Sequence, residues 1–419
     1  MTDKKAVILA GGKGTRLYPI TSDLPKPLVP VLNTPVITHT LGALARSGVR
    51  EAAVTLSKDT EKIREYLDAA GTKGVRTEYY TESEPRGTAG CVLDAMGFCD
   101  GDFIVLGGDV LFDFDLDGAF EFHKKTGAIA TVIVSHSDEP CRYGNLCYDK
   151  SGKITNFYEK PEWKNVKSDV ISTGIYVLSP RIFDYIPRDG ACDFAKDVFP
   201  KLDGGALYAY DAGGYFLDIG TPEAYLKANF DAARGLIKTI TPSSDIENVI
   251  SPRAKVSRGA MVSGNVIMEG AVICDGASVY NSIVCRGAVV KSNAYVSNAV
   301  VPPHTSVSGD GGSPLGKIKL ENERVSGETA DEISPDSARA KHVFTGTVNA
   351  PYGAAKTLGE LISRGAEDTS DGVKLDFDGG SATLFCSGKN SVVISASAEN
   401  PEYAEKIFSY AENGLENLF

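Results

Sequence analysis

Short apolar runs alternate with helical patterns over residues 1–235. Strands are expected at residues 6–9, 52–56 and 103–106, and a helix around residues 63–67. Another helix is expected where apolar residues share one helical face, at Val36, Ile37, Leu41 and Leu44. This alternation is typical of a largely parallel sheet covered on both faces, so we predict an α/β, Rossmann-like domain. Ligands of such sheets bind beyond the carboxyl ends of the strands.

From residue 250 the apolar positions recur every five or six residues. They are Ile250, Val256, Val262, Ile267, Ile273, Val279, Ile283, Val284, Val290, Val296, Val301 and Val307. Alanine pairs keep the same spacing, since Ala254 and Ala260 are repeated 17 residues later as Ala271 and Ala277. The pattern resembles the left-handed parallel β-helix of hexapeptide-repeat proteins, and a chance valine-rich segment is the alternative. Such prisms present flat faces, so we expect a homo-oligomer assembled through residues 245–308.

The rest of the chain divides into a linker and a small third domain. Residues 309–340 are rich in Gly, Ser, Pro and charge, which predicts a linker. Over residues 341–419 we expect an α+β domain with strands at 373–377, 382–385 and 392–395, and helices at 356–362 and 402–410.

Composition and charge exclude several classes of protein. The 419 residues predict two or three domains, and 42% hydrophobic with 23% charged residues indicate a globular chain. A net charge of -12 argues against a general binder of nucleic acid or anionic membranes. The apolar run at residues 6–10 is too short for a signal segment or a membrane span. The eight cysteines include no C-x-x-C pair, so reducing cytoplasm is the expected location.

A glycine-rich segment directly follows the first expected strand. It reads Leu9, Ala10, Gly11, Gly12, Lys13, Gly14, Thr15, Arg16, Leu17, and Pro25-Lys26-Pro27 comes shortly after. Glycines let the backbone approach phosphate, while Arg16 and Lys26 supply positive charge that the acidic protein otherwise lacks. We therefore predict a triphosphate site, although the sequence is neither a Walker A motif nor G-x-G-x-x-G.

The full string resembles the G-G-x-G-T-R-L…P-K-P signature of the sugar-1-phosphate nucleotidyltransferases. Other family motifs follow in order over the first 230 residues. They are the nucleotide-base loop at residues 85–90, Gly107-Gly108-Asp109, Glu159-Lys160-Pro161, the sugar-site strand at residues 172–176, and residues 216–221 with Asp218. The base loop departs from the family pattern at Arg86, where Leu is common. Taken singly, each could be a cap, a turn residue or a solvated charge. Together and in this order they favour catalytic and ligand-binding roles over these structural ones.

The resemblance implies a role for each matched residue. Asp109 and Asp218, both expected at the carboxyl edge of the sheet, would hold Mg²⁺, which prefers oxygen ligands. Arg16 would hold the departing pyrophosphate and Lys26 the α-phosphate, with no protein nucleophile. The expected nucleotide contacts are Leu9, Ala10, Gly11, Gly12, Gly14, Thr15, Arg16, Glu82, Gly87 and Thr88. The expected sugar-phosphate contacts are Gly144, Glu159, Lys160, Thr173 and Gly174.

Glu82 bears on the choice of base. It stands five residues before Gly87, where uridylyl and thymidylyl relatives commonly carry Gln. A carboxylate accepts both N–H donors on the Watson–Crick edge of guanine, so we predict GTP. The alternatives are a solvated strand-end charge at Glu82 and a uridylyl- or thymidylyltransferase for glucose 1-phosphate. The five histidines form no motif and are expected to be structural or surface residues: His39, His123, His136, His304 and His342.

The C-terminal segment resembles the last domain of phosphomannomutases and phosphoglucomutases, which read D-G-V-K…S-G-T-E-P. Here D-G-V-K stands at residues 371–374, but the phosphate loop has become Ser387-Gly388-Lys389-Asn390-Ser391. The earlier mutase domains are absent from this sequence, so the chain cannot be a complete mutase. The domain order resembles fusions of mannose-1-phosphate guanylyltransferase with phosphomannomutase, which favours mannose 1-phosphate as substrate. A structural tail is expected, with sugar-phosphate sensing through Lys389 as the alternative. A catalytically silent, sugar-nucleotide-sensing subunit is the alternative for the whole chain.

Overall fold

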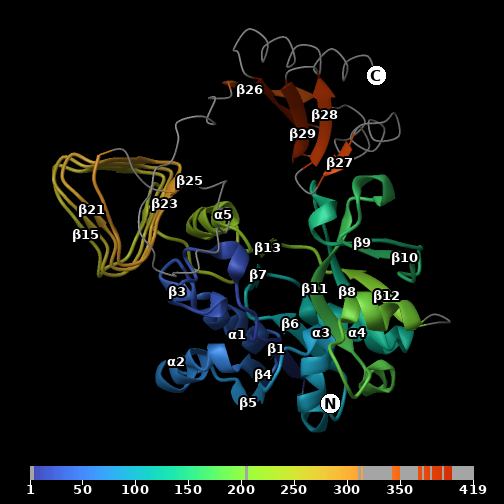
Figure 1. Ribbon diagram of the computed structural model, residues 1–419. Helices are drawn as coiled ribbons and strands as arrows, with labels where there is room; N and C mark the ends of the chain where they lie inside the picture. The colour runs from blue at the N-terminus through green and yellow to red at the C-terminus, as the bar shows by residue number, and fades with distance from the viewer. Residues whose placement is uncertain are drawn as a thin grey trace, which may run out of the picture. The chain divides into compact units, whose positions relative to one another are not determined.

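A computed structural model describes residues 4–202 and 206–309, and further strands at 313–314, 342–349, 367–369, 372–377, 380–388 and 391–398 (Figure 1). The chain forms two compact units. Unit 1 contains Met1–Ile133 and Gly174–Glu321, and unit 2 contains Val134–Thr173 and Asn322–Phe419. The chain passes between the units within β8 (Ala130–His136) and β11 (Val170–Leu178).

Unit 1 is built on a parallel sheet with β1 (Lys5–Leu9) between β4 (Glu51–Ser57) and β6 (Phe103–Gly107). β5 (Arg76–Glu82) pairs with the outer edge of β4, and β11 pairs antiparallel with β6. Leu9 lies opposite both Thr55 and Gly107, so the three parallel strands approach one edge together. The α/β class and the expected strands at residues 6–9, 52–56 and 103–106 are confirmed.

The helices of unit 1 are α1 (Val36–Arg46), α2 (Lys62–Ala70), α3 (Gly87–Gly90), α4 (Leu116–Thr126) and α5 (Pro222–Ala233). Its other strands outside the repeats are β2 (Pro30–Val31), β3 (Thr34–Pro35), β7 (Val110–Phe112), β12 (Leu207–Asp211) and β13 (Phe216–Asp218). Its short 3₁₀ and π segments are η1 (Thr15–Leu17), η2 (Lys26–Leu28), η3 (Lys58–Thr60), η4 (Cys91–Phe98), η7 (Pro180–Tyr185), η8 (Phe194–Val198) and η9 (Phe199–Lys201). No helix in the described ranges combines the length and apolarity of a membrane span.

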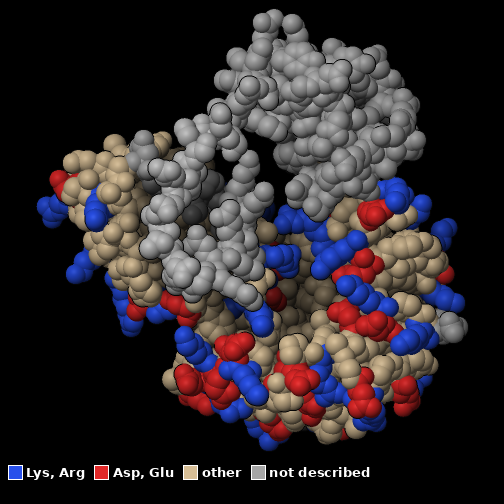
Figure 2. Space-filling model, viewed as in Figure 1, with Lys and Arg blue, Asp and Glu red and all other residues tan. Residues whose placement is uncertain are grey.

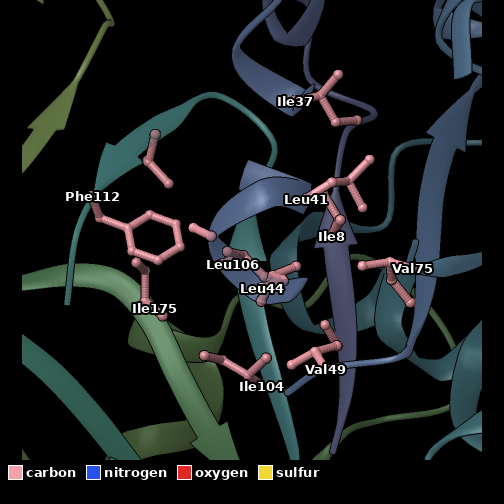
Figure 3. Close-up of a cluster of buried hydrophobic side chains, with 14 of the residues drawn as sticks. Ile8, Ile37, Leu41, Leu44, Val49, Val75, Ile104, Leu106, Phe112 and Ile175 are labelled. Carbon is pink, nitrogen blue, oxygen red and sulfur yellow. The ribbon is translucent and has the colours of Figure 1, made fainter. Parts of the chain in front are cut away.

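The apolar stripe of α1 explains how this helix packs. Ile37, Leu41 and Leu44 are fully buried and point toward Ile8 and Leu106 of the central strands (Figure 3). Full burial of one such side chain stabilises the fold by about 1.5–3 kcal/mol. The hydrophobic pattern therefore orients α1 on the sheet and leaves its more polar face turned away from the core.

The hexapeptide pattern forms a three-sided parallel β-helix. Its first sheet contains β14 (Val249–Ile250), β17 (Val266–Ile267), β20 (Ile283–Val284) and β23 (Ala299–Val301). The second contains β15 (Lys255–Val256), β18 (Val272–Ile273), β21 (Val289–Val290) and β24 (Ser306–Val307), and the third β16 (Met261–Ser263), β19 (Ser278–Tyr280) and β22 (Tyr295–Ser297). Paired residues on neighbouring strands are 17 residues apart in sequence, as the repeat predicts, because Val249 pairs with Val266 and Val266 with Ile283. The aliphatic residues and alanines expected inside form one core, except Ile283, which is buried instead in a cluster on the outside of the first sheet.

The first sheet of the β-helix packs against the α/β part of unit 1. Val266, Ile283 and Val300 are buried in a cluster that also contains Leu17 and Tyr225. An ionic contact lies beside this cluster, because Arg286 Nη1 and His304 Nε2 lie 3.2 and 3.3 Å from Asp23 Oδ2. His304 was expected to be a structural or surface residue, and it is an exposed residue that joins the repeats to the segment between Arg16 and Lys26.

Unit 2 contains one end of the nine-stranded sheet to which β1 and β11 also belong, and a separate antiparallel sheet nearer the C-terminus. In its first part β9 (Gly144–Tyr148) pairs with β10 (Ile154–Glu159), and Asn145 pairs with Ile171 of β11. Its C-terminal sheet has the order β26 (His342–Asn349), β30 (Ser391–Ala398), β29 (Gly380–Gly388), β28 (Gly372–Phe377) and β27 (Glu367–Thr369). The short strand β25 (Ser313–Pro314) does not belong to this sheet and pairs with β23 of the β-helix. The strands expected at 373–377, 382–385 and 392–395 are present. The expected helices at 356–362 and 402–410, most of the expected linker and Lys389 lie outside the described residues.

Candidate active site

The glycine-rich segment turns sharply beyond the carboxyl end of β1. The backbone N–H of Ala10 donates to the carbonyl of Thr55 at 2.9 Å, and that of Gly108 donates to the carbonyl of Leu9 at 2.9 Å. Gly14 has a φ of 62° and precedes η1, and a Cβ there would lie 3.0 Å from Cβ of Lys26. A side chain at this position would meet both a strained backbone and the lysine. Thr15 and Arg16 lie in η1, which continues directly from this turn.

Strand pairing brings the two candidate metal ligands together. Asp109 follows β6 at the carboxyl edge of the parallel sheet, as expected. Asp218 does not lie on that sheet, because it ends β13, which pairs only with β7. Asp218 is opposite Val110, the residue after Asp109, so this antiparallel register places the two carboxylates side by side. The expectation that both lie at the edge of the main sheet is therefore corrected for Asp218.

Lys26 occupies the space between these aspartates. Its Nζ donates to Asp109 Oδ2 at 2.7 Å and to Asp218 Oδ1 at 2.9 Å, and only 8% of its side chain is exposed. Burial by itself would lower the pKa of Lys26, but the negative charges and hydrogen bonds of Asp109 and Asp218 outweigh it and raise the pKa. The lysine is therefore charged at neutral pH.

Arg16 adds a more accessible positive charge next to this cluster. Its Nη2 lies 3.6 Å from Asp218 Oδ2, and 61% of its side chain is exposed. Gly220 permits the approach, since a Cβ there would lie 3.3 Å from the guanidinium carbon. Arg16 can therefore contact Asp218 while keeping most of its donors available to a ligand.

The pair of carboxylates fits a divalent cation. Both already converge on one positive charge, the ammonium of Lys26, at hydrogen-bond distance. No cluster of three or more His, Cys, Asp or Glu suitable for a metal occurs in the described part of the chain. Mg²⁺ commonly takes only one or two protein carboxylates and completes its shell with water and substrate phosphate, so this donor set suits it.

Glu82 lies at the end of β5 beside the glycine-rich segment. Its Oε2 accepts a hydrogen bond from the backbone N–H of Arg86 at 3.1 Å. Its Oε1 would lie 2.9 Å from a Cβ on Gly11. The structure thus brings the proposed base-reading carboxylate to the phosphate-binding loop. Arg86, which stands where Leu is common, instead pairs with Asp94 at 2.8 Å.

The base loop is braced by a segment that the sequence did not single out. Thr88 Oγ1 donates to Asp193 Oδ2 at 2.8 Å and accepts from the N–H of Phe194 at 3.1 Å. The carbonyl of Cys192 accepts from the N–H groups of both Ala89 and Gly90. A Cβ on Gly87, whose φ is 74°, would lie 2.5 Å from that same carbonyl oxygen. These contacts fix the loop, and no local motif could have identified them.

Three of the expected sugar-phosphate contacts lie together in unit 2. Glu159 is opposite Gly144 in the pairing of β10 with β9, and Lys160 Nζ lies 3.8 Å from Glu159 Oε1. A side chain on Gly144 would collide with Phe157 and Glu159. Thr173 is buried in β11, and Gly174, with a φ of 73°, is the next residue, where unit 1 resumes.

The sequence is similar to those of known proteins. The model of the nucleotidyl transferase family matches residues 5–235. The chain is 36% identical over 278 residues to a UTP–glucose-1-phosphate uridylyltransferase of Synechocystis sp., covering 62% of this chain and 69% of that protein. It is 32% identical over 272 residues to a mannose-1-phosphate guanylyltransferase of Mycobacterium tuberculosis, covering 63% and 74%. For the mannose-1-phosphate guanylyltransferase catalytic subunit beta of Drosophila melanogaster the identity is 37%, over 53% of this chain and 61% of that protein.

A solved structure agrees with the fold. It is the crystal structure of a candidate glucose-1-phosphate thymidylyltransferase from Bacillus anthracis, with a TM-score of 0.50 and 29% identity over 54% of this chain and 94% of that one. The family match covers more than half of the chain. The chain therefore belongs to the nucleotidyl transferase family, and its resemblance to the sugar-1-phosphate nucleotidyltransferases within it is confirmed.

Proposed function

We propose that this protein transfers GMP from GTP to mannose 1-phosphate, giving GDP-mannose and pyrophosphate. The observation that carries the proposal is the buried Lys26 held between Asp109 and Asp218, with Arg16 and the glycine-rich turn beside it. The cluster supplies positive charge and oxygen ligands within one site. Those are the groups that a phosphoryl-type transfer needs when no protein nucleophile takes part.

The chain's own residues account for the main requirements of the reaction. A phosphate oxygen of the sugar 1-phosphate attacks the α-phosphorus of GTP, and the bond from that phosphorus to the bridging oxygen of pyrophosphate breaks. Lys26 neutralises negative charge at the α-phosphate, and Arg16 holds the departing pyrophosphate. Asp109 and Asp218 would hold Mg²⁺, which would neutralise further phosphate charge. The attacking oxygen is already anionic, so no general base is required.

Glu82 supports guanine as the base. One of its oxygens accepts the N–H of Arg86, and the carboxylate lies beside Gly11. A carboxylate has about four lone-pair sites, so it can also accept the two donors on guanine's Watson–Crick edge. The alternative is a uridylyl- or thymidylyltransferase for glucose 1-phosphate, and the identity to the Synechocystis uridylyltransferase keeps that alternative open. The guanylyltransferase relatives and Glu82 favour GTP and mannose.

The β-helix supports self-association as a further part of the proposal. Its third sheet exposes Met261 and Tyr295, with 57% and 49% of each residue accessible. The rings of Tyr280 and Tyr295 lie 6.0 Å apart on the same sheet. Exposed apolar residues gathered on a flat face are typical of protein interfaces. The molar mass in solution, measured by light scattering, tests whether the chain is a homo-oligomer, and a monomeric mass at micromolar concentration contradicts it.

The first experiment is a panel of pyrophosphate-release assays. GTP, UTP, dTTP and ATP are each combined with mannose 1-phosphate, glucose 1-phosphate or N-acetylglucosamine 1-phosphate, with Mg²⁺ present or removed by chelation. The proposal expects the highest kcat/KM with GTP and mannose 1-phosphate, and activity only with the metal. Preference for another pair keeps the enzyme class and removes the guanine assignment. Absence of turnover with every pair favours the catalytically silent subunit.

A further inference from the structure

A pocket of unit 1 lies apart from the residues of the candidate active site. Its volume is about 400 Å³, within the range of small-molecule sites. It is bounded by the β2–β3 hairpin, helix α1, the turn after α2 and the segment at residues 239–241 that leads toward the β-helix. It contains none of Arg16, Lys26, Asp109 and Asp218.

The lining of this pocket is basic and rich in hydroxyl groups. His39, Arg46 and Lys73 contribute to it, together with four threonines, Thr34, Thr38, Thr239 and Thr241. No Asp or Glu occurs among the described residues of the lining. That is informative in a protein of net charge -12, and Lys and Arg are mixed with Asp and Glu over the face shown in Figure 2. The charged side chains of the lining are therefore all positive, which favours an anionic ligand.

Two glycine-containing segments position the positive charges. On α1, Thr38 and Arg46 lie four residues before and after Gly42, so the three residues share one face of the helix. A Cβ on Gly42 would lie 3.6 Å from Arg46 Nη1, so the guanidinium folds back along the helix over the glycine. Lys73 adopts a φ of 57° in a turn between Gly71 and Gly74, both also at positive φ. A positive φ is unfavourable for an L-residue, so contacts with the rest of the protein or with a ligand are needed to maintain this turn.

The basic groups are close enough to influence one another. Burial lowers the pKa of His39, and the charges of Lys73 and Arg46 lower it further. The pKa of Arg46 is lowered by burial. His39 Nε2 is bonded to the carbonyl of Val31 at 3.0 Å, which fixes its ring at the wall of the pocket. The charges of Lys73 and Arg46 therefore both reach His39, and an anion bound beside them would offset their effect on its ring.

We propose that this pocket binds a small phosphate ester. The phosphate lies between Arg46 and Lys73, and the threonine hydroxyls contact the polar body that carries it. Arginine and lysine are the usual partners of phosphate, and hydroxyl groups suit a sugar or a ribose. The pocket is a second site, distinct from the one proposed for catalysis.

Contacts of the pocket wall connect it to both parts of the catalytic cluster. Thr239 Oγ1 donates to the carbonyl of Phe112 at 3.3 Å, and β7, which ends at Phe112, begins next to Asp109. Val31, the partner of His39, lies in the strand that follows the 3₁₀ turn of Lys26. A ligand in the pocket therefore contacts side chains bonded to the two segments that position Asp109 and Lys26. We expect it to change the turnover rate.

Isothermal titration calorimetry on the full chain tests the site, with glucose 6-phosphate and GMP as probes for a sugar phosphate and a nucleotide. The pocket variant is Arg46→Gln with Lys73→Gln, and Lys255→Gln with Arg258→Gln on the β-helix is the control of equal charge. Gly42→Met fills the pocket without changing charge and raises helix propensity. We expect at least one probe to bind the pocket variant about tenfold or more weakly than the wild type, because charge-assisted contacts are lost. The same probe should also bind Gly42→Met about tenfold or more weakly, because the pocket is filled. Its affinity for the control variant should be unchanged.

Circular dichroism confirms that the variants are folded, and the KM values of the substrates report whether the catalytic site is intact. The probe that loses more affinity identifies the class of ligand. If the probes bind the wild type, the pocket variant and Gly42→Met with equal affinity, they bind only at the catalytic site, and the proposal is overturned. Absence of binding of either probe to the wild type at millimolar concentration would also overturn it.

Discussion

Replacement of Lys26 by Met is the most direct test of the catalytic cluster. The change removes the ammonium that lies 2.7 Å from Asp109 and 2.9 Å from Asp218, and leaves two carboxylates facing each other. The hydrophobic stem of the side chain is largely retained, so packing changes little. We expect loss of activity together with a measurable loss of stability.

The magnitude follows from the geometry. At an effective dielectric constant of about 20, each contact corresponds to about 6 kcal/mol of Coulomb attraction, most of which is offset by desolvation of Lys26. Removal of one partner from a buried ion pair costs about 3–5 kcal/mol. Asp109 and Asp218 keep 32% and 23% of their side chains exposed, so water relieves part of the repulsion. We therefore expect the low end, about 3 kcal/mol, or about 6–12 °C in Tm for a unit of this size.

Thermal unfolding followed by circular dichroism measures this change, with EDTA present so that no metal replaces the lysine. The variant Lys26→Met/Asp109→Asn/Asp218→Asn is the matched control, because it removes the repulsion and should recover most of the lost Tm. Addition of Mg²⁺ should raise the Tm of Lys26→Met more than that of the wild type, since no ammonium competes for the carboxylates. An unchanged Tm for Lys26→Met in EDTA would refute the picture of a cation-dependent aspartate pair.

Further predictions concern single residues. Asp109→Asn should abolish pyrophosphate release while the chain stays folded, and full activity in the release assay would remove Asp109 from the mechanism. Glu82→Gln should lower kcat/KM with GTP about tenfold or more relative to UTP, and an unchanged GTP-to-UTP ratio would exclude Glu82 from base recognition. Gly14→Ala should cost about 1–2 kcal/mol in urea unfolding because of its positive φ, whereas Gly12→Ala, with open space around it, should cost little. For His123, burial lowers the pKa to about 4, so the unfolded chain takes up the proton first. Stability is then complete above about pH 6.5 and falls by about 3 kcal/mol as the pH drops to 4. His123→Gln should flatten that part of the pH dependence of unfolding, and an unchanged slope would contradict the burial argument.

The sequence predicted the local features of this protein well. The strand at residues 6–9, the stripe of α1 and the 17-residue repeat depend on spacing along the chain, and all three are present in the structure. The site residues came from motifs, but motifs carry no information on pairing between distant segments. Asp218 reaches Asp109 through the register of β13 with β7 rather than through the main sheet.

Contacts between distant segments were the least predictable. Asp23 and Arg286 are 263 residues apart, and nothing in either local sequence indicates that they meet. His304 has no motif around it, so its pairing with Asp23 could be found only in three dimensions. The basic pocket could not be predicted for the same reason, because its lining comes from four segments and no one of them contains a recognisable ligand motif.

The buried first sheet of the β-helix has a consequence for protein engineering. Leu17 follows Arg16 directly, and with Ile20 and Tyr225 it shares a core with Val266 and Ile283 of the repeats. A shortened protein that stops near residue 240 would retain Arg16, Lys26, Asp109 and Asp218, yet would expose this apolar surface to water. We expect such a truncation to aggregate or to lose the ordered conformation of the segment that contains Arg16. Chimeras that exchange catalytic domains between relatives need to transfer the matching repeats with them.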